Sequence, residues 1–369
     1  MNQMRAVFFL SEDNDSKPLM LETIQFCPIL TWIGEKMSAD GVGRFFVFVG
    51  ATYADEARAC FSPDADVIVS ERQEDLLQFL GEDGAVVVFP RAALPIPAVG
   101  DEANDTYTAD AAALRSGAAP WTNVSGGTAL PGYVTVSDRK QLQAMQLRCR
   151  DAIVAGHSAR GVVLLDPGAV YIDPRATIGA GTVLLPGTLL RGKTAIGKDC
   201  EIGPNSVVRD CTVGDSSTVN ASQINESTVG SHTKIGPFAY VRPGSTIGDD
   251  IKVGDFVEVK NSVIGNGTKI SHLTYVGDSD IGERVNFGCG TVTTNYDGFH
   301  KYRTVVGNDV FIGCNTNLVA PVSVGDGAYI AAGGTITKDV PADSLAIARV
   351  QATIKDDWAA KRRRLHGKK

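Results

Sequence analysis

The sequence lacks several features that would place it in other classes of protein. It has no apolar run of about 18 residues, which a membrane-spanning helix needs, and its start, MNQMRAVFFLSEDND, does not have the pattern of a signal peptide. Its seven cysteines include no CxxC pair, so neither a zinc site nor a redox motif is expected, and reduced thiols fit best. The net charge of -7 argues against a general nucleic-acid binder. We therefore expect a cytoplasmic protein with no nucleic-acid or membrane partner.

The first third of the chain alternates between buried strands and helices. This alternation favours an α/β domain with a parallel sheet over residues 1–136. We expect strands at 5–9, 45–49, 67–69, 85–89 and 133–136, and helices at 28–37, 54–60 and 71–79.

A long helix is expected over residues 137–160. Ser137 is the expected N-cap, Gly156 is the expected stop, and Leu142, Met145 and Cys149 fall on one helical face with Ile153. The pattern leaves two interpretations open. The helix either joins two domains or simply packs on the front domain.

From Ile178 an aliphatic residue recurs every six positions as far as Val208. After one slip the pattern resumes at Val213 and continues to Ile336, mostly in steps of six, and glycine often follows the aliphatic residue directly. The chain has 40 glycines, most of them in this half, which indicates many tight turns. A sustained hexad predicts a parallel β-helix in which three hexads form one coil, so that residues three hexads apart stack. We assign this β-helix to residues 161–345. The excursion at 294–304 is expected to be a functional loop, and residues 346–369 form a basic tail.

From about residue 137 to the C-terminus the sequence resembles the GlmU family. That family comprises bifunctional enzymes, glucosamine-1-phosphate acetyltransferase and N-acetylglucosamine-1-phosphate uridyltransferase, of bacterial cell-wall (peptidoglycan) precursor synthesis. The resemblance implies a left-handed β-helix, acetyl-CoA as co-substrate, and a homotrimer with active sites between subunits. The matching segments are VSDRKQLQ (136–143), DPGAVYID (166–173), GPFAYVRPGS (236–245), VGDFVEVKNS (253–262), SHLTYVGD (271–278), NFGCGTVTTNYDG (286–298), FIGCNTNLVAPVSVG (311–325) and AIARVQ (346–351).

The resemblance implies that His272 is the catalytic base and that Glu258 orients it. An imidazole can accept and release a proton near neutral pH, as amide formation from an amine and a thioester requires. Taken alone, a histidine on a β-helix is more often a surface residue, and it is the match of SHLTYVGD that favours catalysis.

Arg242 and Lys260 are separated by three hexads, so the repeat predicts that they stack on one face and bind a phosphate. The alternative is two solvated cations neutralised by Asp255 or Glu258. By resemblance, three further residues complete the sugar-phosphate site: Tyr275, Asn286 and Lys301.

By resemblance, the residues that contact acetyl-CoA are Cys289 (through its backbone), Asn295, Tyr296, Cys314, Ala332 and Arg349. Cys289 and Cys314 depart from the family, which usually has alanine and serine at these positions. With no histidine beside them in the sequence, we interpret both as packing residues rather than nucleophiles. A zinc enzyme of this fold would need three converging histidines, which the five in this sequence do not suggest. No metal is therefore expected for acetyl transfer.

The front domain departs further from the family. Where the family has a glycine-rich loop with an arginine that holds the nucleotide phosphates, this chain reads LSEDNDSKP (10–18), with Glu12, Asp13 and Asp15 set to repel phosphate. Pro90 and Arg91 follow the strand where the family has a metal-binding aspartate, and Ser137 matches its second ligand. We therefore expect a degenerate nucleotidyltransferase-like domain, with Mg²⁺ relevant only if uridyl transfer survives.

The resulting hypothesis is an N-acetyltransferase that acts on glucosamine-1-phosphate in the UDP-N-acetylglucosamine pathway. Three alternatives stay open: a fully bifunctional enzyme, an acetyltransferase for another amino sugar, and a non-catalytic regulatory or partner-binding protein.

Overall fold

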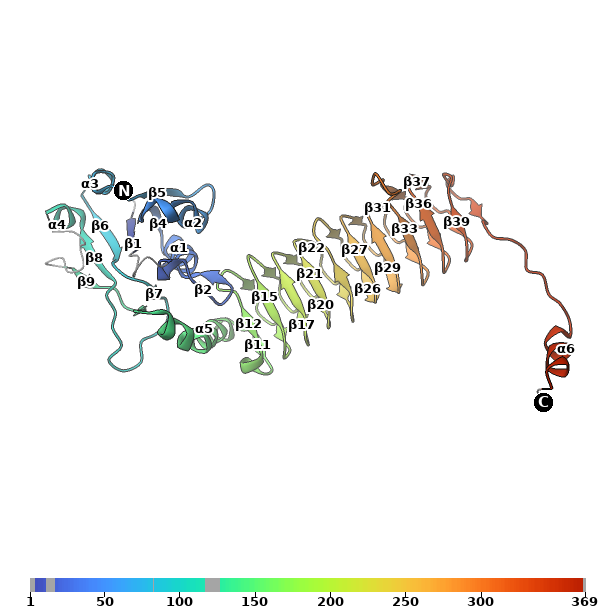
Figure 1. Ribbon diagram of the computed structural model, residues 1–369, viewed down its shortest axis with the longest axis horizontal. Coiled ribbons are helices and arrows are strands. Elements are labelled where there is room, and N and C mark those ends of the chain that lie inside the picture. Colours follow the sequence, from blue (N-terminus) through green and yellow to red (C-terminus); the bar gives the residue numbers. More distant parts are fainter. Residues whose placement is uncertain (1–3, 11–16, 82, 117–126, 368–369) are drawn as a thin grey trace. The chain divides into compact units, whose positions relative to one another are not determined.

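The computed structural model describes residues 4–10, 17–81, 83–116 and 127–367. The chain divides into two compact units, residues 1–237 and 238–369. The first contains an α/β domain, a long helix and the early coils of a β-helix, and the second contains the later coils and the tail (Figure 1). The acidic loop residues Glu12, Asp13 and Asp15 lie outside the described residues.

The α/β domain is built on a six-stranded sheet in the order β5-β4-β1-β6-β8-β9. Its strands are β1 (Met4–Phe9), β4 (Val42–Phe48), β5 (Asp66–Ser70), β6 (Ala85–Phe89), β8 (Tyr107–Asp110) and β9 (Thr128–Ala129). Its helices are α1 (Ile29–Ala39), α2 (Ala54–Ala59), α3 (Gln73–Phe79) and α4 (Ala111–Ser116). Short antiparallel pairs join β2 (Thr23–Ile24) to β3 (Cys27–Pro28) and β7 (Ala93–Leu94) to β10 (Val134–Thr135).

The expected parallel sheet is confirmed for β1, β4, β5 and β6, and two antiparallel strands extend it, so that the sheet as a whole is mixed. β8 pairs antiparallel with β6, and β9 pairs antiparallel with β8. The connection at 90–106 contains no helix. A parallel return normally needs a crossover, usually helical, so the chain comes back in the opposite direction.

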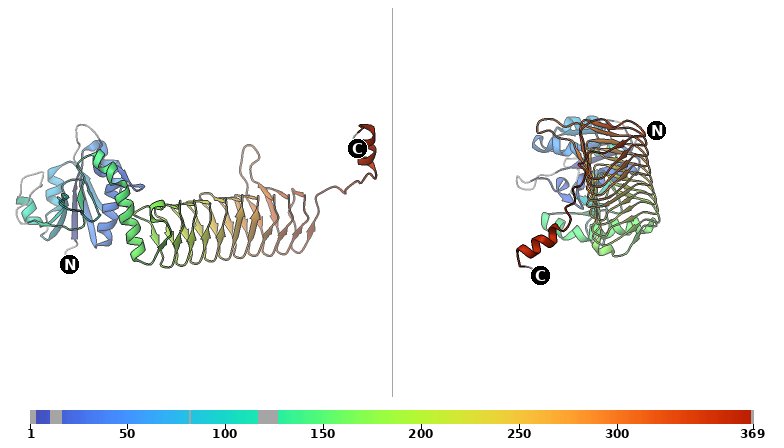
Figure 2. Two further views of the ribbon diagram at one scale, coloured as in Figure 1. Left: turned by 90° about the horizontal axis from the view of Figure 1, so that it is seen from below. Right: turned by 90° about the vertical axis from the view of Figure 1, so that its right-hand side faces the viewer.

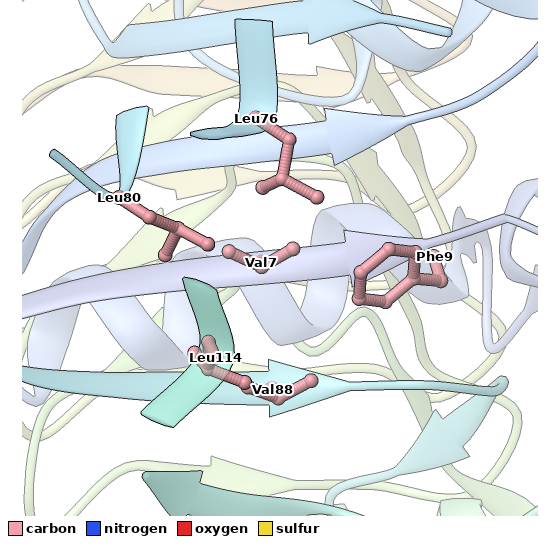
Figure 3. Close-up of a pocket in the computed structure, with 6 residues that line it drawn as sticks. All are labelled: Val7, Phe9, Leu76, Leu80, Val88 and Leu114. Atoms are coloured by element: carbon pink, nitrogen blue, oxygen red, sulfur yellow. The ribbon is translucent and has the colours of Figure 1, made fainter. Parts of the chain in front are cut away.

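Both faces of this sheet are packed. Along β1, Phe8 faces one side, where its ring stacks on Phe89 with 4.9 Å between centroids. Val7 and Phe9 face the other side. There, all six residues that surround the small gap shown in Figure 3 are apolar, so this region is hydrophobic core rather than a ligand site. They are Val7, Phe9, Leu76, Leu80, Val88 and Leu114.

The long helix is α5 (Arg139–Ala159). Its N-cap is Asp138, whose carboxylate accepts from the Gln141 amide at 2.7 Å, so the expectation of Ser137 was wrong by one residue. The helix also continues three residues beyond Gly156, the expected stop. Its Leu142 face packs into the core of the α/β domain, while the Arg150 guanidinium donates to the carbonyl oxygen of Gly168 in the early coils at 2.8 Å. The helix therefore packs on the front domain and also joins it to the early coils of the β-helix.

The early coils, in the first unit, form three parallel stacks of short strands. The first is β11 (Val163–Leu164), β14 (Val183–Leu184), β17 (Glu201–Ile202), β20 (Thr218–Val219) and β23 (Lys234–Ile235). The second is β12 (Tyr171–Ile172), β15 (Leu189–Arg191), β18 (Val207–Arg209) and β21 (Gln223–Asn225). The third is β13 (Thr177–Ile178), β16 (Ala195–Ile196), β19 (Thr212–Val213) and β22 (Thr228–Val229).

The later coils, in the second unit, repeat this arrangement. Stack one is β26 (Lys252–Asp255), β29 (Lys269–His272), β32 (Asn286–Phe287), β35 (Phe311–Ile312), β38 (Tyr329–Ile330) and β40 (Leu345–Ala346). Stack two is β24 (Tyr240–Val241), β27 (Glu258–Lys260), β30 (Tyr275–Gly277), β33 (Val292–Thr294), β36 (Asn317–Val319) and β39 (Thr335–Ile336). Stack three is β25 (Thr246–Ile247), β28 (Val263–Ile264), β31 (Ser279–Ile281), β34 (Thr304–Val306) and β37 (Val322–Val324).

The hexad prediction is confirmed. The aliphatic residues of the repeat, from Ile178 to Ile336, are all buried, and the fold is the left-handed parallel β-helix that the resemblance implies. Vertical neighbours are three full hexads apart in some coils, as for Val241 and Val259, and one residue closer in others, as for Val253 and Ile270. The uneven spacing arises because some turns are one residue shorter, and it decides which side chains meet.

Two segments depart from the coils. The loop between β33 and β34 projects from them, as the orange-brown hairpin in the left view of Figure 2 shows. The basic KRRR sequence lies in a helix, α6 (Trp358–Leu365), rather than in an irregular tail. In the parts of the chain that are described, every helix falls short of the length and apolar character that crossing a bilayer would require.

Candidate active site

His272 and Asp255 form a hydrogen-bonded pair on adjacent coils. They are the last residues of β29 and β26 and are direct partners in the parallel ladder. The imidazole Nδ1 lies 2.6 Å from the Asp255 Oδ1, and 54% of the His272 side chain is exposed. The hydrogen bond from His272 holds the pKa of Asp255 below its usual range. The other ring nitrogen, Nε2, has no hydrogen-bond partner among the residues that the structure describes, so it is available to a substrate.

This pair corrects the expectation for Glu258. The sequence comparison assigned Glu258 to His272, but its carboxylate bonds to the Arg242 guanidinium, with 2.9 Å between Nη1 and Oε1. The physical reason lies in the register. Glu258 begins β27 in stack two, whereas His272 ends β29 in stack one, and the ladder partners of Glu258 are Tyr240 and Tyr275.

Arg242 and Lys260 follow one another on adjacent coils, because β24 and β27 pair in register through Val241 and Val259. Each already has a carboxylate partner. Lys260 Nζ lies 3.3 Å from an oxygen of Asp278, just as Arg242 binds Glu258. The spacing therefore predicted their placement correctly, and a phosphate at this face would meet two cations whose charge is already partly balanced.

Asp278 is the centre of a buried polar cluster. Its side chain is only 7% exposed, and it accepts from Lys260, from Asn261 Nδ2 at 2.6 Å, and from the Asn295 amide. Burial alone would raise the pKa of Asp278, but the hydrogen bonds from Asn261, Asn295 and Lys260 outweigh it and lower that pKa. Sequence reasoning missed Asp278, and it considered Asp255 only as a possible partner of Arg242 or Lys260, not as the partner of His272. Both pairings could have been found from the sequence spacing, because Asp278 follows Lys260, and His272 follows Asp255, by the length of one coil.

Two of the expected sugar ligands lie on different stacks. Tyr275 begins β30 in stack two, and its phenol folds back over Gly277, where a Cβ would come within 2.2 Å of the hydroxyl oxygen. That glycine is the ladder partner of Lys260, so Tyr275 borders the Asp278 cluster. Asn286 begins β32 in stack one, which also carries His272, and it pairs with Lys269.

Three of the expected acetyl-CoA contacts line up along one corner of the coils. The Asn315 amide bonds to the carbonyl of Cys289, and the Gly333 amide bonds to the carbonyl of Cys314, each at 2.8 Å. Cys289, Cys314 and Ala332 therefore occupy the same position on three successive coils. Arg349 joins them, because its guanidinium donates to the Ala332 carbonyl at 2.8 Å.

The remaining expected contacts are divided between the cluster and the loop. Asn295 is buried, and its amide lies with Asp278, 3.5 Å from the Tyr275 hydroxyl, rather than at the corner with Cys314. Tyr296 and Lys301 face each other across the hairpin of the projecting loop. The Asp297 carboxylate accepts hydrogen bonds from the backbone amides of residues 299 and 300 at the tip of that loop. These hydrogen bonds lower the pKa of Asp297.

Among the described residues, no three His, Cys, Asp or Glu side chains form a group that could hold a metal ion. The structure thus shows three local features on these coils: an imidazole with a carboxylate partner, two carboxylate-paired cations, and a corner of small residues that ends at an arginine.

Comparison with known proteins confirms the resemblance to the GlmU family. Residues 167–255 and 224–324 match the family model described as the GMPPB C-terminal domain. The bifunctional protein GlmU of Brevibacillus brevis is 51% identical over 226 residues, covering 61% of this chain and 49% of that protein. GlmU of Acetivibrio thermocellus is 51% identical over 234 residues, covering 63% and 51%. This chain thus spans about half the length of the curated relatives it matches.

Two solved structures also align with this chain, at low similarity. The UDP-N-acetylglucosamine acyltransferase from Campylobacter jejuni aligns with 53% of this chain and 77% of its own, at 19% identity and a TM-score of 0.32. The corresponding Arabidopsis enzyme aligns with 56% and 72%, at 19% identity and a TM-score of 0.34.

Proposed function

We propose that this chain transfers the acetyl group of acetyl-CoA to the amine of glucosamine-1-phosphate, in the route to UDP-N-acetylglucosamine and peptidoglycan. The observation that carries the proposal is His272. It lies in the segment shared with GlmU proteins, its Nδ1 is held by a carboxylate, and its Nε2 is open to solvent. The similarity to GlmU proteins, about 50% identity over the half that contains this segment, supports the choice of reaction.

In the proposed mechanism, His272 Nε2 accepts a proton from the amine as the nitrogen attacks the thioester carbonyl. The new C–N bond forms, the C–S bond breaks, and the coenzyme A thiolate leaves and takes up the proton that the imidazolium gives back. Arg242 and Lys260 hold the sugar phosphate, which Lys301 reaches from a neighbouring subunit. Tyr275 and Asn286 hold the sugar. Acetyl-CoA is contacted by Cys289, Cys314, Ala332 and Arg349, together with Asn295 and Tyr296.

The test is release of coenzyme A, measured with a thiol reagent. We expect His272→Ala to lower acetyl transfer on the order of 10²- to 10⁴-fold, the usual contribution of a positioned base. The matched control is His232→Ala, which removes a histidine from a coil of the first unit. Near-normal turnover by His272→Ala would refute the role of His272. If the wild type released no coenzyme A with any amino sugar, a non-catalytic role would replace the proposal.

The acceptor is tested by comparing glucosamine-1-phosphate with other amino sugars. The paired cations Arg242 and Lys260 favour a phosphorylated acceptor. A higher kcat/KM for an amino sugar without phosphate would favour the alternative of a different acceptor.

We further propose that uridyl transfer is lost. Pro90 and Arg91 follow the strand after which the family has a metal-binding aspartate, and Arg91 is a cation that lies 3.9 Å from Asp105. Between β6 and β10 the described residues form only β7, β8, α4 and β9, less than the substrate pocket that the family carries there. We expect no UDP-N-acetylglucosamine from UTP and N-acetylglucosamine-1-phosphate with Mg²⁺ present. Pyrophosphate release that scales with pure protein would support the bifunctional alternative.

The proposal includes a homotrimer with active sites between subunits, in a cytoplasm where acetyl-CoA is available and thiols stay reduced. Sedimentation equilibrium tests the assembly, and a mass other than that of three chains would contradict it. The projecting loop with Lys301 is the segment that we expect to reach a neighbouring subunit.

A further inference from the structure

Three carboxylates of the site have three different partners. Asp255 bonds to His272, Glu258 bonds to Arg242, and Asp278 bonds to Lys260. In the described part of the chain, Asp255 is the acidic side chain that is hydrogen-bonded to the imidazole. The arrangement therefore separates the carboxylate that contacts the base from the two carboxylates that contact the cations of the phosphate site.

The close contact between Asp255 and His272 depends on the backbone beside it. Gly254 precedes Asp255, and a Cβ at this glycine would lie 1.9 Å from the carbonyl oxygen of Ser271, which precedes His272. Only glycine allows the two coils to approach this closely. The same approach brings the two ladder partners, Asp255 and His272, within hydrogen-bond distance.

We propose that Asp255 is the positioning residue for His272 and that Glu258 instead orients Arg242. This inference rests on the proposed acetyl transfer. The Asp255 carboxylate accepts the Nδ1–H of the neutral imidazole, which fixes the tautomer and points the Nε2 lone pair outward. When Nε2 takes the amine proton, the adjacent carboxylate stabilises the imidazolium. The proton stays on the ring until the thiolate takes it, and Asp255 is not protonated.

Two lysines lie on the strands that carry this pair. Lys252 begins β26 and lowers the pKa of Asp255 further, and Lys269 begins β29 as the ladder partner of Lys252. The next strand of stack one, β32, is Asn286 and Phe287 and carries no charge. Removing the charge of Asp255 therefore takes away the carboxylate that is hydrogen-bonded to His272, which disfavours the imidazolium.

The decisive experiment compares Asp255→Asn with Glu258→Gln, two substitutions that each remove one charge and keep the shape. For Asp255→Asn we expect kcat to fall on the order of 10- to 100-fold. We also expect the acid limb of the pH profile of kcat/KM to move to lower pH, with KM for glucosamine-1-phosphate little changed. For Glu258→Gln we expect the KM for glucosamine-1-phosphate to change, while the acid limb of the pH profile of kcat/KM stays where it is in the wild type. The reverse pattern, or an acid limb that neither variant moves, would overturn the proposal.

A second measurement does not depend on turnover. Diethyl pyrocarbonate modifies neutral imidazole, and mass spectrometry of the His272 peptide gives its modification rate at each pH. We expect the midpoint of this rate to move to lower pH in Asp255→Asn and to stay unchanged in Glu258→Gln. If Asp255→Asn does not fold, as judged by circular dichroism, Asp255→Glu replaces it and should keep the wild-type midpoint.

The two measurements separate the two ideas. A wild type that releases no coenzyme A contradicts the proposed function, while a shifted modification midpoint in Asp255→Asn still supports the pairing. If the wild type is active but Asp255→Asn leaves the midpoint of His272 modification unchanged, only the pairing of Asp255 with His272 is contradicted. The same holds if Asp255→Glu shifts that midpoint.

Discussion

Asp278→Asn should be among the most destabilising polar substitutions in the second unit. The carboxylate is buried and accepts from Lys260, Asn261 and Asn295. An asparagine of the same shape keeps one acceptor for Asn261 but turns an NH₂ group toward Lys260 and Asn295, so that donors face donors. Breaking a buried pair on one side costs roughly 3–5 kcal/mol. Because 19% of the Lys260 side chain still reaches solvent, we expect a loss of about 3 kcal/mol.

The assay is urea unfolding followed by circular dichroism. The matched control is Asp280→Asn, two residues away, which removes the partner of Arg303 at the surface, where the side chains are 48% and 42% exposed. An exposed pair contributes at most about 1 kcal/mol. If both variants lose the same small amount of free energy of unfolding, the argument that the Asp278 cluster is structurally important is refuted.

The pH dependence gives an independent check. The pKa of Asp278 is lower in the folded chain than in the unfolded one, so its stabilising contribution is fully present above the unfolded pKa, about pH 4, and is lost as the pH falls through the folded value. The difference in free energy of unfolding between wild type and Asp278→Asn should therefore shrink below about pH 4. A difference that stays constant to lower pH would contradict this assignment.

Three further predictions concern the phosphate site, the coil contacts and the thiols. Arg242→Ala should raise KM for glucosamine-1-phosphate roughly 10- to 100-fold, because a charge-assisted contact is lost, and leave KM for acetyl-CoA unchanged. If Arg242→Ala raised the KM for plain glucosamine by the same factor as the KM for glucosamine-1-phosphate, the role of Arg242 would be only structural. Gly254→Ala should lower the free energy of unfolding by about 1–3 kcal/mol through overlap with a backbone carbonyl. The control Gly334→Ala, whose Cβ would meet only ordinary contacts at 3.4 Å, should be near neutral in the same assay. The double variant Cys289→Ala, Cys314→Ser should keep coenzyme A release near wild type, and a loss on the order of 100-fold would show that a thiol takes part in the reaction.

The β-helix and the alternation of strands and helices in the front domain could be predicted from the sequence, because the apolar residues that become buried recur in it at regular intervals. A residue every six positions must point inward in each coil, so Ile178 through Ile336 could be assigned before the fold was known. The same periodicity placed Arg242 above Lys260, since no shortened turn lies between them. The antiparallel strands β8 and β9 were missed, because Tyr107–Asp110 and Thr128–Ala129 are too short and too polar to show a strand period.

The pairing of charges could be decided only by the tertiary structure. Asp255, Glu258 and Asp278 all lie within about two coils of His272, Arg242 and Lys260 in the sequence, but the sequence does not determine which carboxylate bonds to which of these three residues. The choice depends on turn lengths that make some coils one residue shorter than others, and on the glycine at 254 that lets two coils approach. A hydrogen bond requires its two atoms to lie within about 3 Å, whereas a hexad locates a side chain only to a face of a coil. The repeat therefore determined the scaffold, and the contacts between its coils determined which carboxylate binds the imidazole.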